Sequence, residues 1–365
     1  MGFVVYRLYL ARPKWPKIRA RNLSMIYREK WEPRKGSLKK DWVPMTKPVV
    51  AVVIPSYKVT AHIVQTIGEI GPEVSYIYIV DDACPDGSGK LVEKEVKDKR
   101  VKVIYHAENQ GVGGATVSGY RAALESDAQI VVKLDGDGQM DPALIKDLIA
   151  PIVTGRADYT KGDRFDSLTG LSKMPGIRLF GNAGLTLLTK ISTGYWIVTD
   201  LTNGYTAIHR DALQALPLAM LSKRFFFESD ILFRLSIYRA VVWDVPMIAR
   251  YGNEKSNLSI VKTLWEFPWK HFKNFHKRLF YNYYLRDISA ASIELPLGML
   301  LWWFGVFSGL GALNSSLTNG IAASTGTVMI AVVPLILGFQ LLLAFVSHDV
   351  SSVPTRPKHR QNLEW

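Results

Sequence analysis

A long stretch without charge near the C-terminus constrains this chain most. No Asp, Glu, Lys or Arg occurs from Leu295 to Ser347, and this window holds two apolar blocks, Leu295–Leu313 and Thr327–Val346. At a rise of about 1.5 Å per residue, each block of roughly 20 residues makes a helix about 30 Å long, the thickness of a bilayer's hydrocarbon core. The sequence therefore predicts two membrane-spanning helices. A buried hairpin is the alternative, but core helices are usually shorter and flanked by charges.

The charges around these blocks predict their orientation. Arg286 precedes the pair, Arg356, Lys358 and Arg360 follow it, and the loop Asn314–Gly326 carries no charge. Because Lys and Arg concentrate on the cytoplasmic side, both ends of the pair and the large N-terminal domain are expected in the cytoplasm. The prediction is a two-span protein of the inner or plasma membrane, if its source is bacterial.

The N-terminal arm and the single cysteine give weaker indications. Residues 1–47 hold thirteen Lys and Arg against three acids, so ten of the thirteen net positive charges lie there. Beside a membrane anchor, such an arm suits an anionic leaflet, with about 1 kcal/mol per basic residue; a solvated tail is the alternative, and no nucleic-acid partner is expected. The first residues are too short an apolar stretch, broken by Arg7, for a signal peptide. With Cys84 alone, no intrachain disulfide can form, which agrees with a reducing compartment.

Between the arm and the apolar blocks, strand-like and helix-like segments alternate. Four apolar runs, each bounded by turn residues, are Val49–Ile54, Tyr76–Val80, Val101–Tyr105 and Ile130–Leu134. Helical patterns separate them, which predicts a parallel sheet with helices on its faces. The segment Gly155–Gly184 is expected to be loop-rich.

The fourth run leads directly into Asp135-Gly136-Asp137-Gly138-Gln139. Ligands of open α/β sheets bind outside the carboxyl ends of the strands. Two carboxylates and an amide oxygen there suit a hard divalent cation, and Mg²⁺ leaves its other positions to water and substrate phosphates. The motif predicts a site for a metal-bound diphosphate, whereas an Asp-Gly turn with helix-capping acids is the alternative.

Four other polar segments are candidates for the same site. Asp81-Asp82 ends the second strand, where an acid can bind a base or ribose or cap a turn. The glycine-rich segment Asn109–Ala115 can present N–H groups at a helix start. Cations at Lys161–Arg164 can neutralise a diphosphate, and acids at Phe227–Asp230 can face a sugar or cap a helix.

Residues 262–287 interleave nine aromatic residues with Lys and Arg just before the first apolar block. This composition predicts helices that lie in the headgroup layer. Packing of the aromatic rings against the preceding α/β domain is the alternative. The same alternation can bind single-stranded nucleic acid, but its position beside a membrane span disfavours that function.

Taken together and in this order, the segments resemble a family-two glycosyltransferase with the GT-A (Rossmann-like) nucleotide-sugar-binding fold. More narrowly, they resemble the dolichyl-phosphate mannose synthase and polyprenyl-phosphate glycosyltransferase group. The motifs are IPSY at 54–57, VDDACPDGSG at 80–89, NQGVGGA at 109–115, KLDGDGQMDP at 133–142, KGDRF at 161–165, NGYTAIHR at 203–210 and FFESD at 226–230. The QxxRW motif of processive synthases does not follow Asp230.

The resemblance implies roles for residues of this chain. The donor would be bound by Pro55, Tyr57, Asp81, Asp82, Asp135, Arg164, Arg250 and Lys255. Mg²⁺ or Mn²⁺ would be surrounded by Asp135, Asp137 and Gln139, with Asp137 as the most direct ligand. The acceptor phosphate would meet Arg178 and Asn182, and the general base, if one acts, would be Asp230 or Glu228. Two departures are Lys58-Val59, where the family often has Asn-Glu, and the spacing to Lys255.

The expected organisation is a basic arm (1–47), a GT-A domain (48–260), juxtamembrane amphipathic helices (261–293), a two-helix transmembrane hairpin (294–347) and a cytoplasmic tail (348–365). The expected activity is metal-dependent, inverting transfer of a sugar from a nucleotide diphosphate sugar to a polyprenyl phosphate. The alternatives are transfer to a hydroxyl of a lipid-linked glycan and a non-catalytic nucleotide-sugar-binding scaffold. The sugar, the nucleotide base, the lipid and the oligomeric state stay open.

Overall fold

The computed structural model describes residues 47–165, 176–247 and 260–361 of the 365-residue chain. For 176–182 and 260–265 it describes the backbone. The basic N-terminal arm lies outside the described residues, except for its last residue. All described residues belong to one compact unit, Pro44–Trp365.

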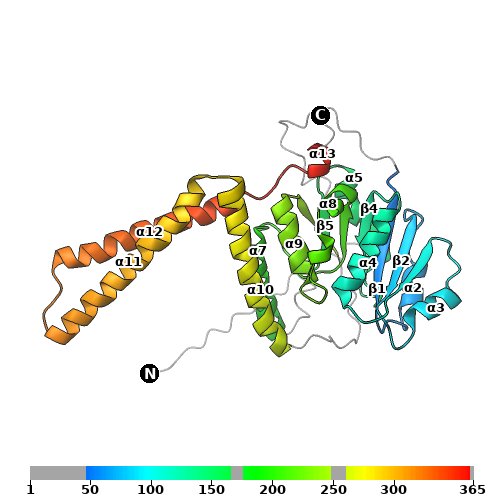
Figure 1. Ribbon diagram of the computed structural model, residues 1–365, viewed down its shortest axis with the longest axis horizontal. Coiled ribbons are helices and arrows are strands. Elements are labelled where there is room, and N and C mark those ends of the chain that lie inside the picture. Colours follow the sequence, from blue (N-terminus) through cyan, green and yellow to red (C-terminus); the bar gives the residue numbers. More distant parts are fainter. Residues whose placement is uncertain (1–46, 166–175, 248–259, 362–365) are drawn as a thin grey trace, which may run out of the picture. The chain divides into compact units, whose positions relative to one another are not determined.

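Among the described residues, seven strands form one sheet in the order β3-β2-β1-β4-β6-β5-β7 (Figure 1). The strands are β1 (Val50–Ser56), β2 (Tyr76–Asp81), β3 (Val101–Tyr105), β4 (Ile130–Lys133), β5 (Tyr159–Asp163), β6 (Thr206–His209) and β7 (Val242–Pro246). The first four are mutually parallel, with Val52 of β1 between Ile77 of β2 and Val132 of β4. Strand β6 runs antiparallel to both of its neighbours. The predicted α/β sheet is confirmed, and β6 makes it mixed.

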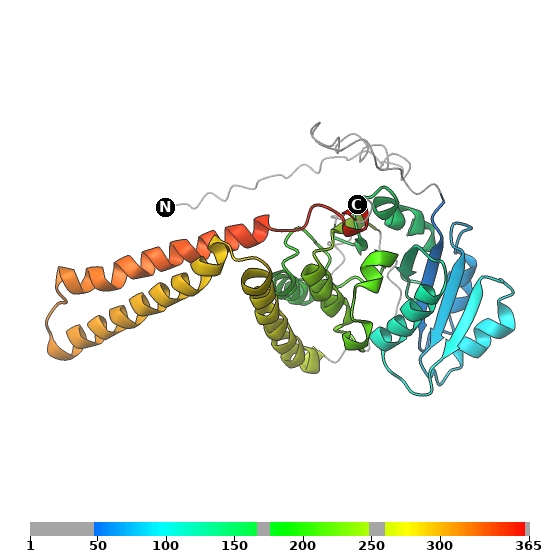
Figure 2. The same cartoon turned by 45° about the horizontal axis from the view of Figure 1, so that its top comes forward.

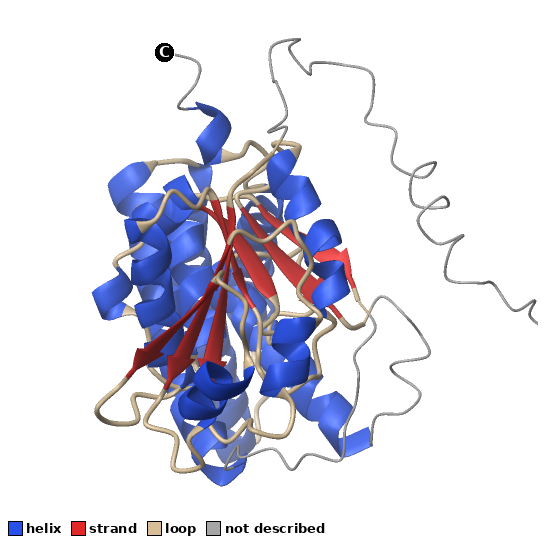
Figure 3. Cartoon of the chain, turned by 90° about the vertical axis from the view of Figure 1, so that its right-hand side faces the viewer, coloured by secondary structure: helices blue, strands red, loops and turns tan. Residues whose placement is uncertain are grey.

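Helices cover both faces of the sheet (Figure 3). One face carries α2 (Ile63–Gly68), α3 (Ser88–Glu95) and α5 (Ile145–Val153), and the other carries α4 (Val112–Glu125), α8 (Arg210–Gln214) and α9 (Phe227–Tyr238). Alternate residues of β1 therefore enter different cores: Val52 packs toward α2, and Val53 toward α4. Because both faces are buried, the strands read as continuous apolar runs rather than as alternating ones.

Two long helices, α7 (Gly176–Thr193) and α10 (Ile260–Phe280), pack side by side (Figure 1). Buried His271 of α10 bonds Ser192 of α7 through Nδ1 at 2.8 Å, and burial lowers the pKa of His271 to about 4. Aromatic side chains of α10 divide between two environments: Phe267 packs edge-on against Phe226, with ring centroids 5.2 Å apart, whereas Trp269 is 58% exposed. Packing against the sheet domain is therefore confirmed for Phe267, and placement of the exposed rings in the headgroup layer stays a prediction.

After a π-helical turn, η4 (Tyr281–Arg286), the chain forms an antiparallel hairpin of α11 (Ala290–Asn319) and α12 (Thr325–Ser351), as Figure 2 shows. Both helices are long and apolar enough to cross a bilayer, and little of either is buried. Glycines let the two backbones approach: a Cβ added at Gly338 would lie 2.5 Å from the backbone nitrogen of Trp302. We call this pair the apolar hairpin.

Beyond α12 the chain returns to the sheet domain, where the short helix α13 (Lys358–Gln361) docks. The imidazole Nδ1 of His359 lies 2.7 Å from Oδ1 of the buried Asp158, and the backbone N–H groups of Lys358 and His359 also donate to this carboxylate. The His359 ring stacks on His209 at 4.3 Å between centroids. Burial and the nearby His359 lower the pKa of His209 to about 4. We call these contacts the C-terminal clasp.

Candidate active site

A buried lysine links the two acidic segments at the carboxyl end of β4. Lys133 is 1% exposed, and its Nζ lies 2.8 Å from Asp135 Oδ1 and 3.4 Å from Glu228 Oε1. Burial opposes its charge, but the two carboxylates outweigh burial and raise the pKa of Lys133. Lys133 was not among the predicted site residues. Its signals in the sequence are a charge inside the apolar run Ile130–Leu134 and its place as the first residue of the motif at 133–142.

The loop after β4 offers oxygen ligands of the kind that Mg²⁺ or Mn²⁺ takes. One oxygen of Asp137 accepts the backbone N–H of Gln139 at 3.0 Å, whereas one oxygen of Asp135 accepts the Lys133 ammonium. In the described part of the chain, no three His, Cys, Asp or Glu residues are grouped to hold a metal. One or two carboxylates completed by substrate phosphates is a usual Mg²⁺ arrangement, so the donor set fits. Because an ammonium competes with a cation for Asp135, the geometry favours Asp137 as the direct ligand.

The acids that end β2 organise two loops beside this motif. Asp81 accepts the backbone N–H groups of Cys84 and Gly89 at 2.7 and 2.6 Å. Asp82 accepts those of Gln110 and Gly111 at 2.8 and 2.7 Å. Both side chains are almost completely buried. They therefore order the loops that the resemblance places around the nucleoside.

At the end of β1, Pro55 pairs with Val80 of β2 and the ring of Tyr57 is 40% exposed. Lys58 follows with φ +58°, a left-handed conformation that is uncommon for lysine. Its backbone N–H donates to the sulfur of Cys84 at 3.1 Å. This bond joins the loops after β1 and β2, so it holds in place the backbone next to Tyr57.

The glycine-rich segment serves protein packing. A Cβ added at Gly113 would overlap the backbone oxygen of Ser222, and Gly114 donates its N–H to the Lys223 oxygen at 3.0 Å. The backbone that approaches these glycines belongs to the segment that leads into α9. The glycine-rich segment thereby fixes the position at which α9, the helix that carries Glu228, begins.

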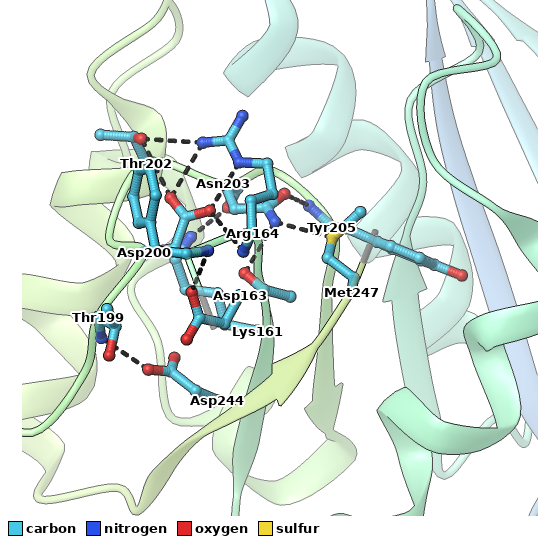
Figure 4. Close-up of polar contacts among 12 residues, drawn as sticks. Lys161, Asp163, Arg164, Thr199, Asp200, Thr202, Asn203, Tyr205, Asp244 and Met247 are labelled. Carbon is cyan, nitrogen blue, oxygen red and sulfur yellow. Dashed lines mark hydrogen bonds and ion pairs between the residues drawn. The ribbon is translucent and has the colours of Figure 1, made fainter. Parts of the chain in front are cut away.

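Arg164, just beyond β5, is held by a buried carboxylate (Figure 4). Its Nε and Nη2 donate to the two oxygens of Asp200 at 2.6 and 2.9 Å, and Nη2 lies 3.3 Å from Thr202 Oγ1. Burial raises the pKa of Asp200, but Arg164 outweighs burial and the net pKa is lowered. Bidentate pairing of this kind fixes the guanidinium plane. The guanidinium of Arg164 is therefore held in place and does not belong to a loose surface turn.

Two further ionisable groups lie behind Arg164 (Figure 4). The fully buried Lys161 donates to the backbone oxygen of Asn203, and burial lowers its pKa to about 8 despite nearby carboxylates. Asp244 accepts the backbone N–H of Thr199 at 2.6 Å, and burial raises its pKa to about 6. Lys161 belongs to the predicted cationic segment Lys161–Arg164, whereas Asp244 was not predicted to belong to the site.

The structure separates the two acids at the start of α9. Asp230 is 5% exposed, accepts the backbone N–H of Ser222 at 2.8 Å and lies 3.5 Å from the Arg234 guanidinium. Glu228, in contrast, shares the Lys133 ammonium with Asp135, so the two carboxylates lie close together. Glu228 is therefore the acid of this pair that lies with the predicted metal-binding motif after β4.

The remaining predicted residues lie elsewhere. Arg178 and Asn182 fall in the first turns of α7, where the backbone is described. Arg250 and Lys255 lie outside the described residues. Their predicted contacts with acceptor and donor stay predictions.

Comparison with known proteins identifies the family. The family described as Glycosyl transferase family 2 matches residues 51–216. The UDP-N-acetylglucosamine–dolichyl-phosphate N-acetylglucosaminyltransferase of Methanococcus voltae is 30% identical over 222 residues, which cover 57% of this chain and 88% of that protein. The undecaprenyl-phosphate mannosyltransferase of Micrococcus luteus is 31% identical over 202 residues, covering 54% and 82%. The chain belongs to glycosyl transferase family 2, and its mixed sheet is GT-A-like.

Among solved structures, glucosyl-3-phosphoglycerate synthase from Mycobacterium tuberculosis is similar, with a TM-score of 0.48 and 18% identity. The match covers 63% of this chain and 80% of the synthase.

Proposed function

We propose that this glycosyltransferase moves a sugar from a nucleotide diphosphate sugar to a polyprenyl phosphate, with inversion, at the cytoplasmic face of a membrane. One observation carries the proposal: the acidic loop after β4 and the apolar hairpin belong to the same compact unit of the chain. Relatives support it, because the names of two of them specify dolichyl phosphate and undecaprenyl phosphate. An enzyme for such acceptors has to work where the lipid phosphate lies.

In the proposed reaction, an oxygen of the acceptor phosphate attacks the anomeric carbon, and the nucleoside diphosphate leaves from the opposite face of the sugar. A phosphomonoester has a second pKa near 6, so the attacking oxygen already carries charge at neutral pH and needs no strong base. Arg164, fixed by Asp200, presents its cation to the donor phosphates. A divalent cation held by Asp137 and Asp135 would neutralise charge on the departing diphosphate.

The C-terminal clasp and the positive charges support the cytoplasmic assignment. The chain leaves the sheet domain before α11 and bonds to the same domain again at Asp158 after α12. A hairpin of two spans that starts and ends at one domain has both ends on one side of the bilayer. Lys and Arg flank those ends, which favours the cytoplasm for that side.

The proposal is tested by Asp137→Ala in the full-length protein. We expect loss of transfer from labelled nucleotide sugars to undecaprenyl or dolichyl phosphate, with unchanged thermal unfolding. EDTA should stop the wild-type reaction, and Mg²⁺ or Mn²⁺ should restore it. Asp147→Ala, which removes an exposed carboxylate of α5, is the matched control and should retain activity. Turnover of Asp137→Ala at the wild-type rate with metal present would refute the metal assignment.

Transfer to a sugar hydroxyl instead of a phosphate is the second candidate, and the position of Glu228 favours it. A hydroxyl needs a general base, and Glu228 is the acid that Lys133 holds beside Asp135. Glu228→Gln should then abolish transfer to a lipid-linked glycan. A phosphate acceptor should tolerate this change much better, so the variant distinguishes the two acceptors.

A further inference from the structure

One buried carboxylate in the last turns of α12 receives hydrogen bonds from three other segments. Asp349 is 2% exposed, and Arg278 of α10 donates to its two oxygens at 2.6 and 3.0 Å. The hydroxyl of Tyr283 in η4 donates at 2.6 Å, and Nε1 of Trp196, in the loop after α7, at 2.8 Å. We call these four residues the Asp349 node.

The node reaches α7 as well. Arg278, itself 3% exposed, donates from Nη2 to the backbone oxygen of Ile191 at 2.9 Å. It also packs over Gly194, where an added Cβ would lie 2.6 Å from Nη1. The C-terminal turns of α7 are thus bonded, through one arginine, to the end of the apolar hairpin.

Stability alone does not account for this arrangement. Asp349 is the only Asp, Glu, Lys or Arg in α12. Taking a charge pair out of water is costly, and well-packed apolar residues often stabilise a buried position as well or better. What a hydrogen-bonded charge pair adds is a defined register, because its directional bonds form in one alignment. Besides Asp349, the two helices carry one other Asp, Glu, Lys or Arg, Glu294 near the start of α11, and no hydrogen bond or ion pair described for it reaches α7 or α10.

We propose that Asp349 is a positioning residue for the lipid acceptor. It fixes the depth of α7 relative to the apolar hairpin, so that the helix carrying Arg178 and Asn182 stands where the bilayer presents a lipid phosphate. The inference rests on the proposed function. A long polyprenyl chain holds its phosphate at the depth of the bilayer surface, whereas a short, soluble prenyl phosphate reaches the site from water. Asp349 therefore matters for the long acceptor and not for the short one.

The test uses full-length protein in liposomes and compares undecaprenyl phosphate with geranyl phosphate as acceptors. In Asp349→Asn the KM for undecaprenyl phosphate should rise on the order of tenfold or more, because a displacement of about 1 Å can cost up to about a hundredfold. The kcat and KM for geranyl phosphate should stay at the wild-type values. Val350→Ala, at the adjacent and 41% exposed position, is the matched control and should leave both acceptors unaffected.

Equal loss with both acceptors, or no change with either, would overturn the role of Asp349. If Asp349→Asn does not fold, Trp196→Phe removes a single donor and keeps the Arg278 pair; it must show the same selective rise in KM, and its absence would overturn the proposal. Wild-type protein that glycosylates neither acceptor would instead overturn the proposed function, and this inference with it. The two failures are therefore distinguishable.

Discussion

Two fully buried lysines on either side of β6 offer a matched test of the electrostatics of the site. Lys133 of β4 and Lys161 of β5 both stand opposite Thr206 in the sheet register. Lys133 contacts two carboxylates, which raise its pKa, whereas Lys161 contacts a backbone oxygen and has its pKa lowered to about 8. Replacing each lysine with methionine should therefore affect the free energy of unfolding very differently.

The magnitudes follow from the surroundings. Breaking a fully buried ion pair costs about 3–5 kcal/mol, and because the Asp135 side chain is 31% exposed we reduce this to about 2–3 kcal/mol for Lys133→Met. For Lys161, a folded-state pKa of about 8 against an ordinary 10.5 means that stability falls as pH drops from 10.5 through 8. At neutral pH this penalty is about 3 kcal/mol, and its removal in Lys161→Met offsets the lost hydrogen bond of about 1.5–3 kcal/mol.

Thermal unfolding of the full-length protein in detergent, with EDTA at neutral pH, measures the difference. A loss of 2–3 kcal/mol lowers Tm by roughly 4–12 °C for a domain of this size. Lys133→Met should show that decrease, and Lys161→Met should melt at or above the wild-type temperature. Equal decreases in the two variants would refute the reasoning, because they would show that burial of the alkyl chain, not the carboxylate partners, determines the effect.

Two further predictions concern stability. Because burial raises the pKa of Asp244 to about 6, its contribution is fully present below about pH 3.8 and is lost as pH rises through 6. Asp244→Asn should therefore gain up to about 3 kcal/mol over wild type as pH rises from about 4 to about 7, and a pH-independent difference in Tm would contradict this. Gly113→Ala should lose about 1–3 kcal/mol in urea unfolding, because its Cβ overlaps the Ser222 oxygen. The control Gly184→Ala, in open space on α7, should gain about 0.5–1 kcal/mol; equal stability of the two variants would exclude the packing role.

The parallel half of the sheet could be predicted because its strands are buried on both faces. Val50–Ser56 and Ile130–Lys133 carry side chains into two apolar cores, so hydrophobicity alone marks them. The predicted loop-rich segment Gly155–Gly184 was wrong in two places, since it contains β5 and the first half of α7. Strand β5 reads Tyr-Thr-Lys-Gly-Asp, and its polar residues are buried because neighbouring segments bond them. Such partners are invisible in a local pattern.

The candidate site could be predicted in part for the same reason. The loop after β4 was found because consecutive residues carry its chemistry. The choice between Glu228 and Asp230 was not predictable, because both lie in the first turn of α9. They differ in what the fold brings to them: Lys133 to the first, Ser222 and Arg234 to the second. The Asp349 node joins residues more than 60 positions apart and has no local signal.

The C-terminal clasp has a consequence for the order in which the molecule is completed during synthesis. Asp158 is fully buried, yet three of the four hydrogen bonds described for its side chain come from Lys358 and His359. Those residues follow the apolar hairpin in the sequence, so they leave the ribosome after it. Until then the carboxylate keeps one backbone partner, from Val241, and stays open to water. The edge of the sheet domain at Asp158 is thus completed only once the apolar hairpin has been made, which couples completion of this domain to synthesis of the hairpin.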